Sequence, residues 1–185
     1  MMGHRGYGHA ELSFDNCRIP KDAVLGEVGR GFKLIMQSIL QVRLAHIGAR
    51  AVGMGQRALE MMRRYAAERH QFGQPIGDFQ MVQKMIADSA IELFGVKMMV
   101  LNAAWDIDQG KEPRDKVSMI KVAASEMQGR IVDRAIQVFG GMGYTKEMPL
   151  ERMYRDARVT RIYDGTSEVH RMLIARSTIK NGLLL

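Results

Sequence analysis

Apolar residues recur at helical spacing along most of this 185-residue chain, in long stretches separated by prolines and glycines. These stretches predict helices at about 32–69, 78–109, 114–139, 150–158 and 166–180. Most residues in them are good helix formers such as Ala, Leu, Met, Arg and Glu. Long helices joined by short loops predict an all-α fold, an antiparallel four-helix bundle.

The N-terminal residues 9–19 follow a different pattern. Ala10, Leu12 and Phe14 alternate with polar residues, and the alternation stops at Asp15 and Asn16. This predicts one β-strand followed by a turn. One strand cannot form a sheet, and its free edge needs partners, so the chain is expected to begin within a larger unit.

Two expectations concern the core. The first long helix carries small residues where glycine costs about 1 kcal/mol relative to alanine, so close packing against that backbone is expected. These residues are Ala45, Gly48, Ala49, Gly53 and Gly55. Many of the 16 methionines are expected to fill gaps in the core, together with Phe94 and Trp105.

Composition narrows the class of protein. The chain is 46% hydrophobic and 25% charged, which is ordinary for a globular domain and excludes global disorder. No run approaches about 18 apolar residues, so no membrane span is predicted. Residues 1–9 lack a signal-peptide core, and Cys17 has no partner for an internal disulfide. We therefore expect a cytoplasmic protein, or one from a reducing compartment like the mitochondrial matrix.

The net charge is +7, from 27 Lys and Arg against 20 Asp and Glu. These charges are dispersed and no nucleic-acid reading motif accompanies them, so no nucleic-acid partner is predicted. A solvated surface with one or two anion contacts accounts for the excess. The five histidines lack metal-ligand spacing, so no metal site is predicted either.

Two loops have the composition of ligand contacts. The loop at 69–76 combines Arg69 with Phe72, a glycine and Pro75, which suits a phosphate contact or a helix C-cap. The loop at 137–144 has three glycines in four positions after a helix. It either admits a flat or phosphorylated ligand close to the backbone or simply ends the helix.

A third loop, at 161–169, opens the last predicted helix. Thr166 or Ser167 can cap that helix, and Glu168 suits its positive end. The free N–H groups of the helix start favour an anion. Asp164, just before Gly165, is either a functional carboxylate or an Asp-Gly turn that bonds its own backbone.

Taken together, the three loops resemble the acyl-CoA dehydrogenase family. The similarity is carried by Arg-x-x-Phe-Gly-x-Pro-Ile-x-x-Phe-Gln at 69–80, Gln-Val-Phe-Gly-Gly-Met-Gly-Tyr at 137–144, and Ile-Tyr-Asp-Gly-Thr-Ser-Glu-Val-His-Arg at 162–171. The order and spacing are those of the family. Family members have an N-terminal helical domain, a middle β-domain and a C-terminal four-helix bundle. By resemblance, residues 1–28 are the end of the middle β-domain and its linker, and 29–185 are the bundle.

The resemblance also implies a cofactor, FAD, which lies partly across a subunit interface in the family. Arg69 and Phe72 are expected to contact its diphosphate and adenosine side from a neighbouring subunit. The remaining expected contacts are Phe79, Val82, Gln137, Gly140, Gly141, Thr166 and Glu168. Family enzymes are commonly homotetramers or homodimers built through this bundle, and pass electrons to an electron-transferring flavoprotein.

The implied reaction removes the α-proton of an acyl-CoA thioester while the β-hydrogen passes to flavin as hydride. The usual base is the glutamate of a Tyr-Glu-Gly-Thr sequence, and here Asp164 stands in its place, as in one branch of the family. In other branches the base lies on the first long helix, where this chain has Val42 followed by Arg43. Asp164 is therefore the candidate base, and Arg43, Tyr163 and Gly165 are the expected substrate contacts.

The expected function is therefore the C-terminal domain of an FAD-dependent acyl-CoA dehydrogenase. The chain is expected to be a fragment and inactive alone, because FAD and acyl-CoA lie between domains in the family. One alternative is a non-catalytic helical domain for oligomerisation or partner docking. A further alternative, a related flavoprotein such as a monooxygenase, is disfavoured by the carboxylate at Asp164.

Overall fold

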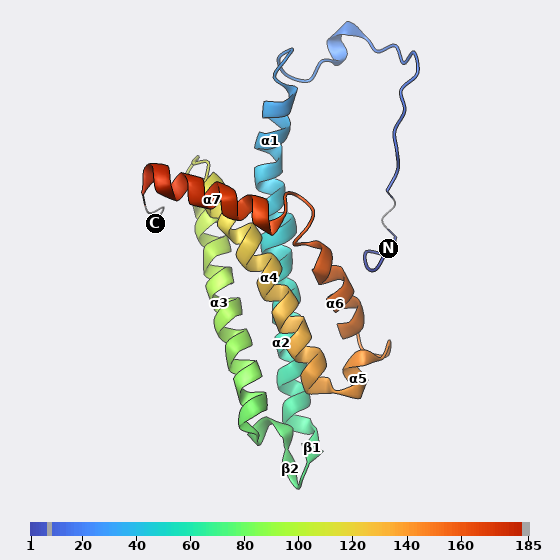
Figure 1. The fold of residues 1–185 in the computed structure, drawn as a ribbon, viewed down its shortest axis with the longest axis vertical. Helices are drawn as coiled ribbons and strands as arrows, with labels where there is room; N and C mark the ends of the chain where they lie inside the picture. Colours follow the sequence, from blue (N-terminus) through green and yellow to red (C-terminus); the bar gives the residue numbers. More distant parts are fainter. Residues whose placement is uncertain (7–8, 183–185) are drawn as a thin grey trace.

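The computed structural model describes residues 1–6 and 9–182 of the chain. The fold is helical, with one small hairpin (Figure 1). In chain order, the elements are η1 (Lys21–Ala23), α1 (Gly31–Val42), η2 (Arg43–Ala49), α2 (Arg50–Glu68), β1 (His70–Gln71), β2 (Gln74–Pro75), η3 (Ile76–Asp78), α3 (Gln80–Asp108), α4 (Arg114–Phe139), α5 (Gly141–Tyr144), α6 (Leu150–Val159) and α7 (Ser167–Asn181).

The predicted antiparallel bundle is confirmed. Helices α2, α3 and α4 run side by side in alternating directions, and the shorter α6 packs along α4 (Figure 1). Helix α7 crosses over the N-terminal part of α4. The predicted first helix is continuous, but seven residues within it, η2, have π-helical hydrogen bonding. Such π segments are rare and often occur at functional sites.

Helix α4 is the centre of the core. It packs against α2, α3, α6 and α7, so its apolar residues are buried on several sides. All its predicted inward residues are buried, namely Val117, Ile120, Ala124, Met127, Ile131, Ala135 and Val138. Fully burying a large apolar side chain contributes roughly 1.5–3 kcal/mol. The Tyr65 ring of α2 stacks on Phe139, with centroids 4.1 Å apart, where these two helices end.

The small residues of the first long helix allow two close approaches. A Cβ on Gly48 would lie 2.9 Å from Ile120 Cγ2 and 3.1 Å from Val100 Cγ2. A Cβ on Gly55 would meet the Met127 sulfur at 3.1 Å. Gly53 has open space instead, because it lies on the exposed side of α2. The expectation of close packing is thus confirmed at Gly48 and Gly55 and is wrong at Gly53.

The predicted β-strand within residues 9–19 is absent from the structure. These residues form no ladder with any part of the chain that the structure describes. Leu12 is 80% exposed and Phe14 79% exposed, and only the turn at Asn16, with φ of 48°, follows the prediction. A strand needs a neighbouring strand to receive its backbone hydrogen bonds, and the alternating pattern had none here.

The placement of Phe94 and Trp105 in the core is wrong. Phe94 is 65% exposed and Trp105 62% exposed on the side of α3 that faces away from the bundle. With Ile91, Met98 and Leu101 they form an apolar strip at alternating spacings of three and four residues, here called the α3 outer strip. Helix α3 thus has two apolar sides, and one chain can cover only one of them.

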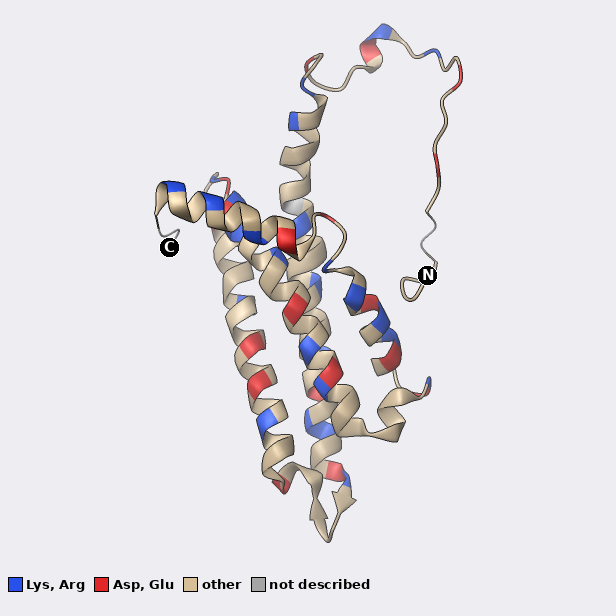
Figure 2. Cartoon of the chain, in the orientation of Figure 1, with Lys and Arg blue, Asp and Glu red and all other residues tan. Residues whose placement is uncertain are grey.

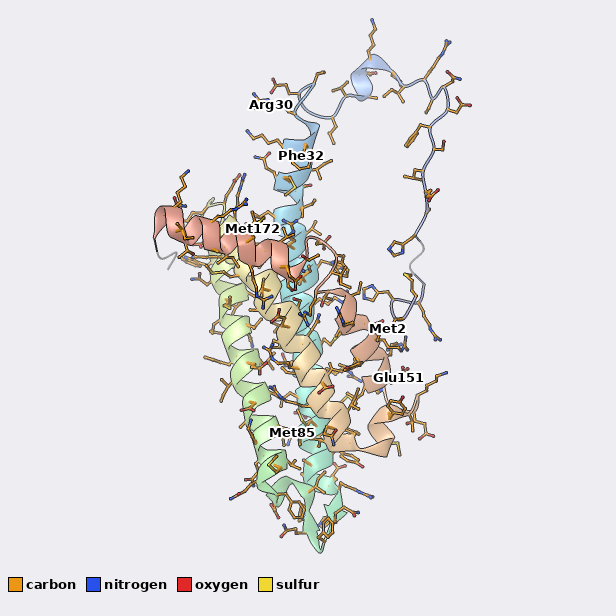
Figure 3. All side chains as sticks on the ribbon, in the orientation of Figure 1. Met2, Arg30, Phe32, Met85, Glu151 and Met172 are labelled. Carbon is orange, nitrogen blue, oxygen red and sulfur yellow. The ribbon has the colours of Figure 1, made fainter. Side chains whose placement is uncertain are left out.

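Part of the first helix is also more exposed than its pattern suggested. Phe32 is 79% exposed and Ile35 56% exposed, because α1 extends beyond the end of the bundle. Figure 3 shows Phe32 on this projecting part of α1. Burial on the first long helix begins near Leu44, where the neighbouring helices start.

The two glycines Gly48 and Gly53 provide a matched test of the packing. Gly48→Ala is expected to lower the free energy of unfolding by about 1–3 kcal/mol, because stiff β-branched neighbours cannot yield to a methyl group. Gly53→Ala is expected to raise it by up to about 1 kcal/mol through helix propensity. Urea denaturation of both variants measures these changes. Equal effects at the two positions would contradict the packing described.

Candidate functional site

Asp164 lies in a tight turn between α6 and α7. Asp164 and Gly165 both have positive φ, 55° and 89°, a conformation that aspartate tolerates and glycine adopts freely. Helix α7 begins directly afterwards, where the Thr166 hydroxyl accepts a hydrogen bond of 3.2 Å from the backbone N–H of Val169. The capping predicted for Thr166 is confirmed. Glu168 lies in the first helical turn, as predicted.

Two basic side chains hold this turn through the main-chain oxygen of Asp164. Arg43 Nε, from η2, donates a hydrogen bond of 2.9 Å to that oxygen. His170 Nε2, from α7, lies 3.2 Å from the same oxygen. The main chain of the turn is therefore fixed from two elements, and the Asp164 side chain is left to point elsewhere.

The Asp164 carboxylate faces a cleft. Its Oδ2 lies 3.8 Å from His46 Nδ1, and the side chain is 30% exposed. The cleft has a volume of about 770 Å³. It is lined by Met1, Met2, Gly3, His4, His9, Val42, His46, Arg155, Arg158, Val159, Ile162, Tyr163 and Asp164. A carboxylate at the wall of an open cleft can reach a ligand bound there.

Tyr163 is fixed beside this carboxylate. Its ring centroid lies 5.6 Å from that of His46, and its hydroxyl accepts a hydrogen bond of 3.3 Å from Arg50. The structure thus brings the predicted substrate residues Arg43, Tyr163 and Gly165 together around Asp164. These four residues and His46 are called the turn site below.

The N-terminal residues lie against one wall of the cleft. The main-chain oxygen of Met2 accepts a hydrogen bond of 2.7 Å from Arg155, and the His4 N–H donates one of 2.6 Å to Asp156. Figure 3 shows Met2 beside α6. Figure 2 shows basic and acidic residues interleaved on α6 and mostly basic ones along α7. The cleft itself is lined by two arginines of α6, Arg155, which is paired with Glu151, and Arg158, and these can contact an anionic ligand.

Positive charge also lies beneath the turn. The Lys121 side chain, from α4, is fully buried, and burial lowers its pKa to about 8 against the attraction of Asp164 and Glu168. Burial likewise lowers the pKa of His170, while its hydrogen bond to the Asp164 backbone opposes the change. Burial lowers the pKa of Arg43, and the Asp164 carboxylate acts in the opposite direction.

The other predicted cofactor residues lie at the opposite end of the bundle. The β1–β2 hairpin presents Arg69 and Phe72, whose ring is 93% exposed and meets Phe79 edge-on at 6.1 Å. Val82 follows in the first turn of α3, partly buried against the core. Gln137, Gly140 and Gly141 lie where α4 ends, and a Cβ at either glycine would meet open space. These seven residues are called the hairpin group below.

The predicted cofactor contacts are therefore divided between the two ends. Thr166 and Glu168 belong with the turn site, close to Lys121 of α4. Gln137 of the hairpin group lies on the same helix as Lys121 and about 24 Å from it, at roughly 1.5 Å per residue. Within one chain, the turn site and the hairpin group therefore lie at opposite ends of the bundle.

Sequence reasoning missed four residues around the turn, namely His46, Arg50, Lys121 and His170. His46 and His170 had been examined only for metal-ligand spacing, and Lys121 falls on the apolar side of a helix. The signal that could have identified Lys121 is a lysine at a position where the helical spacing predicts a buried apolar residue. Among the described residues no cluster of three His, Cys, Asp or Glu could hold a metal, and no helix there is long and apolar enough to cross a membrane.

Residues 29–179 match the family model of the acyl-CoA dehydrogenase C-terminal domain. The chain belongs to the acyl-CoA dehydrogenase family. Its helical bundle is the C-terminal domain of that family, and the predicted family membership is confirmed.

Three similar proteins extend this finding. The human mitochondrial short-chain specific acyl-CoA dehydrogenase is 44% identical over 97% of this chain, and the acryloyl-CoA reductase (NADH) of Anaerotignum propionicum is 42% identical over 97%. A solved structure described as the electron transferring flavoprotein of Acidaminococcus fermentans aligns over 91% of this chain with a TM-score of 0.87 and 36% identity, and the alignment covers 44% of that chain. The present chain spans 43% and 45% of the two relatives' lengths.

The turn of this acyl-CoA dehydrogenase domain can be tested at Gly165. A Cβ there would lie 2.9 Å from His170 Nε2 in addition to the strain of a positive φ. Gly165→Ala is therefore expected to destabilise the domain by more than about 1 kcal/mol in urea denaturation. Gly182→Ala is the control, because Gly182 has a similar φ of 82° but open space around it. A smaller loss at Gly165 than at Gly182 would contradict the contact.

Proposed function

We propose that this domain serves an FAD-dependent acyl-CoA dehydrogenase, in which Asp164 removes the α-proton of an acyl-CoA thioester. The observation that carries the proposal is the placement of the Asp164 carboxylate. It faces the 770 Å³ cleft, while its main-chain oxygen is held by Arg43 and His170. A base must have both a fixed position and free access to its substrate.

The chemistry required of Asp164 is to accept one proton at a carboxylate oxygen. Its side chain reaches about one methylene less far than the glutamate that the family usually places here, so the thioester has to lie closer to the turn. Arg43, Tyr163 and Gly165 are the proposed substrate contacts, because Tyr163 lines the same cleft and Arg43 and Gly165 adjoin Asp164 in the turn. Arg158 and Arg155 in the lining of the cleft suit the phosphates of a CoA thioester.

The residues present fit FAD in two separate parts. The exposed guanidinium of Arg69 and the exposed ring of Phe72 suit a diphosphate and an aromatic base, and Gly140 and Gly141 leave open backbone where α4 ends. At the turn site, Thr166 and Glu168 are the proposed contacts. When bound, the flavin would supply the acceptor for the β-hydrogen as hydride.

The distance between these two groups supports a site shared by two subunits. The hairpin group of one chain would complete the cofactor contacts made by the turn site of another. The proposed assembly is a homotetramer or homodimer. The α3 outer strip supports it, because Ile91, Phe94, Met98, Leu101 and Trp105 form a contiguous apolar surface on one helix.

The proposed electron acceptor is an electron-transferring flavoprotein. Support comes from the close similarity to the structure described as such a flavoprotein from Acidaminococcus fermentans. The two curated relatives are named for short-chain acyl-CoA and acryloyl-CoA, and a small acyl-CoA is therefore the first substrate to test.

Asp164→Asn tests the proposed base in the complete enzyme. We expect substrate-dependent bleaching of the flavin absorbance to fall by at least about 1,000-fold, because an amide cannot accept the proton. The FAD content should remain unchanged. Asp108→Asn is the control, since Asp108 is exposed at the end of α3. Undiminished bleaching in the Asp164 variant would reject Asp164 as the base, whereas a complete wild-type enzyme that is not bleached by any acyl-CoA would favour the non-catalytic alternative.

The α3 outer strip can be tested by replacing Phe94 and Trp105 with serine. Removal of two large aromatic side chains from the proposed interface should shift the sedimentation coefficient of the complete enzyme toward smaller species. Ile179→Ser is the control, because Ile179 is 86% exposed on α7, away from this strip. An unchanged assembly in the double variant would place the subunit interface elsewhere.

A further inference from the structure

Three buried polar atoms lack a hydrogen-bond partner within the part of the chain that the structure describes: Lys121 Nζ, Ser167 Oγ and His170 Nδ1. They occur in one region, where α4 packs against the beginning of α7. Buried polar groups are normally satisfied, so a concentration of exceptions calls for an explanation. Ser167 and His170 are close to Asp164 in sequence, and Lys121 is close to it in space.

His170 contacts the turn directly. It is 1% exposed, and its Nε2 lies 3.2 Å from the main-chain oxygen of Asp164. The same nitrogen occupies the space beside Gly165 where a side chain would otherwise be. His170 therefore holds the main chain of Asp164 and also requires that residue 165 be glycine.

Lys121 acts on the turn through its charge. Its side chain is 0% exposed, and the charged groups that influence it are Asp164, Glu168, Arg43 and Arg161, with His170 nearby. Asp164 and Glu168 flank the start of α7, and both attract the ammonium group. This attraction opposes the cost of burying the ammonium group where α4 packs against α7.

The cost of Lys121 indicates a role other than stability. A buried ammonium group without a hydrogen-bond partner is expensive, and an apolar residue of similar shape would pack here at lower cost. Sites that lose stability in this manner are frequently functional. Asp164 and Glu168, at the turn before α7 and in its first helical turn, offset part of this free-energy cost.

We propose that Lys121 and His170 are positioning residues for Asp164, holding the 163–165 turn from beneath so that the carboxylate faces the cleft. His170 acts by its hydrogen bond to the Asp164 main-chain oxygen, and Lys121 acts as a fully buried ammonium group on α4, where this helix packs against α7. The inference rests on the proposed function, in that the position of Asp164 matters for catalysis. The support of the turn itself can be measured without catalysis.

Three variants separate these contributions. His170→Leu removes the hydrogen bond, His170→Gln retains an N–H donor, and Lys121→Met removes the charge while keeping a side chain of similar length. Lys97→Met is the control for loss of a lysine, since Lys97 is exposed on α3. Arg176→Leu is the control for an apolar replacement on α7.

The first measurement is amide hydrogen exchange on the complete enzyme, resolved by mass spectrometry over the segment that contains the turn. In His170→Leu and Lys121→Met, the amides of Tyr163 and Ser167, which donate hydrogen bonds to the main-chain oxygens of Val159 and Arg161, should exchange at least about 10-fold faster than in the wild type, because the turn opens locally. His170→Gln should restore slow exchange, and the two controls should leave it unchanged. Unaltered exchange in both His170→Leu and Lys121→Met would overturn the proposal.

The second measurement uses the complete enzyme. Lys121→Met and His170→Leu should lower kcat by about 10-fold or more with KM within about 2-fold, since a misplaced base affects the chemical step. His170→Gln should recover most of kcat. An equal rise of KM without a loss of kcat would overturn the positioning role. If Asp164→Asn keeps its activity while exchange at the turn still responds, the proposed function fails and the support of the turn stands.

The third measurement is stability against pH, and it isolates the Lys121 ammonium. Its pKa is lowered from 10.5 to about 8 in the folded chain, so the unfolded chain binds more protons between these values. The stability of the wild type should therefore rise relative to Lys121→Met as the pH increases from about 8 to 10.5. At neutral pH Lys121→Met should have the higher Tm. A parallel dependence in the two proteins would overturn the role of a buried charge at Lys121.

Discussion

The fold depends on the burial of α4. This helix packs against α2, α3, α6 and α7, so the position of each of them is defined by its contact with one central surface. The inward-facing apolar residues of α4 are buried from Val117 to Val138, so that no single neighbouring helix can shift without disturbing this surface. The same helix carries Lys121 in its buried surface, so the scaffold also delivers a charge to the turn before α7.

The turn at Asp164 shows how a rigid bundle positions a short polar segment. Two consecutive residues with positive φ are held by Arg43 from η2 and His170 from α7. The π-helical segment η2 begins at Arg43 and contains His46, so the irregular part of the helix supplies two of the side chains that face the turn. Backbone irregularity, positive φ and buried basic groups thus coincide at one place, which is the usual condition of a functional site.

The two ends of the bundle carry different chemistry. The turn site is partly buried and lies among ionisable groups, while the hairpin group is exposed and combines a cation, an aromatic ring and open glycine backbone. The length of α4 keeps them apart within one chain. Together with the apolar α3 outer strip, this separation favours an assembly in which the surfaces of several copies complete one another.

Periodicity in the sequence determined the helices, their antiparallel order and the buried face of α4, because these follow from local spacing and short connections. The resemblance of the three loops identified the family and singled out Asp164. The sequence could not determine that residues 9–19 would lack a strand, since a strand exists only with a partner. Nor could it show that Phe94 and Trp105 are exposed on the outer side of α3. A helix with two apolar sides does not indicate which of them packs against the bundle. Only the tertiary structure brought His46, Lys121 and His170 to Asp164, since their contacts join segments far apart in the chain.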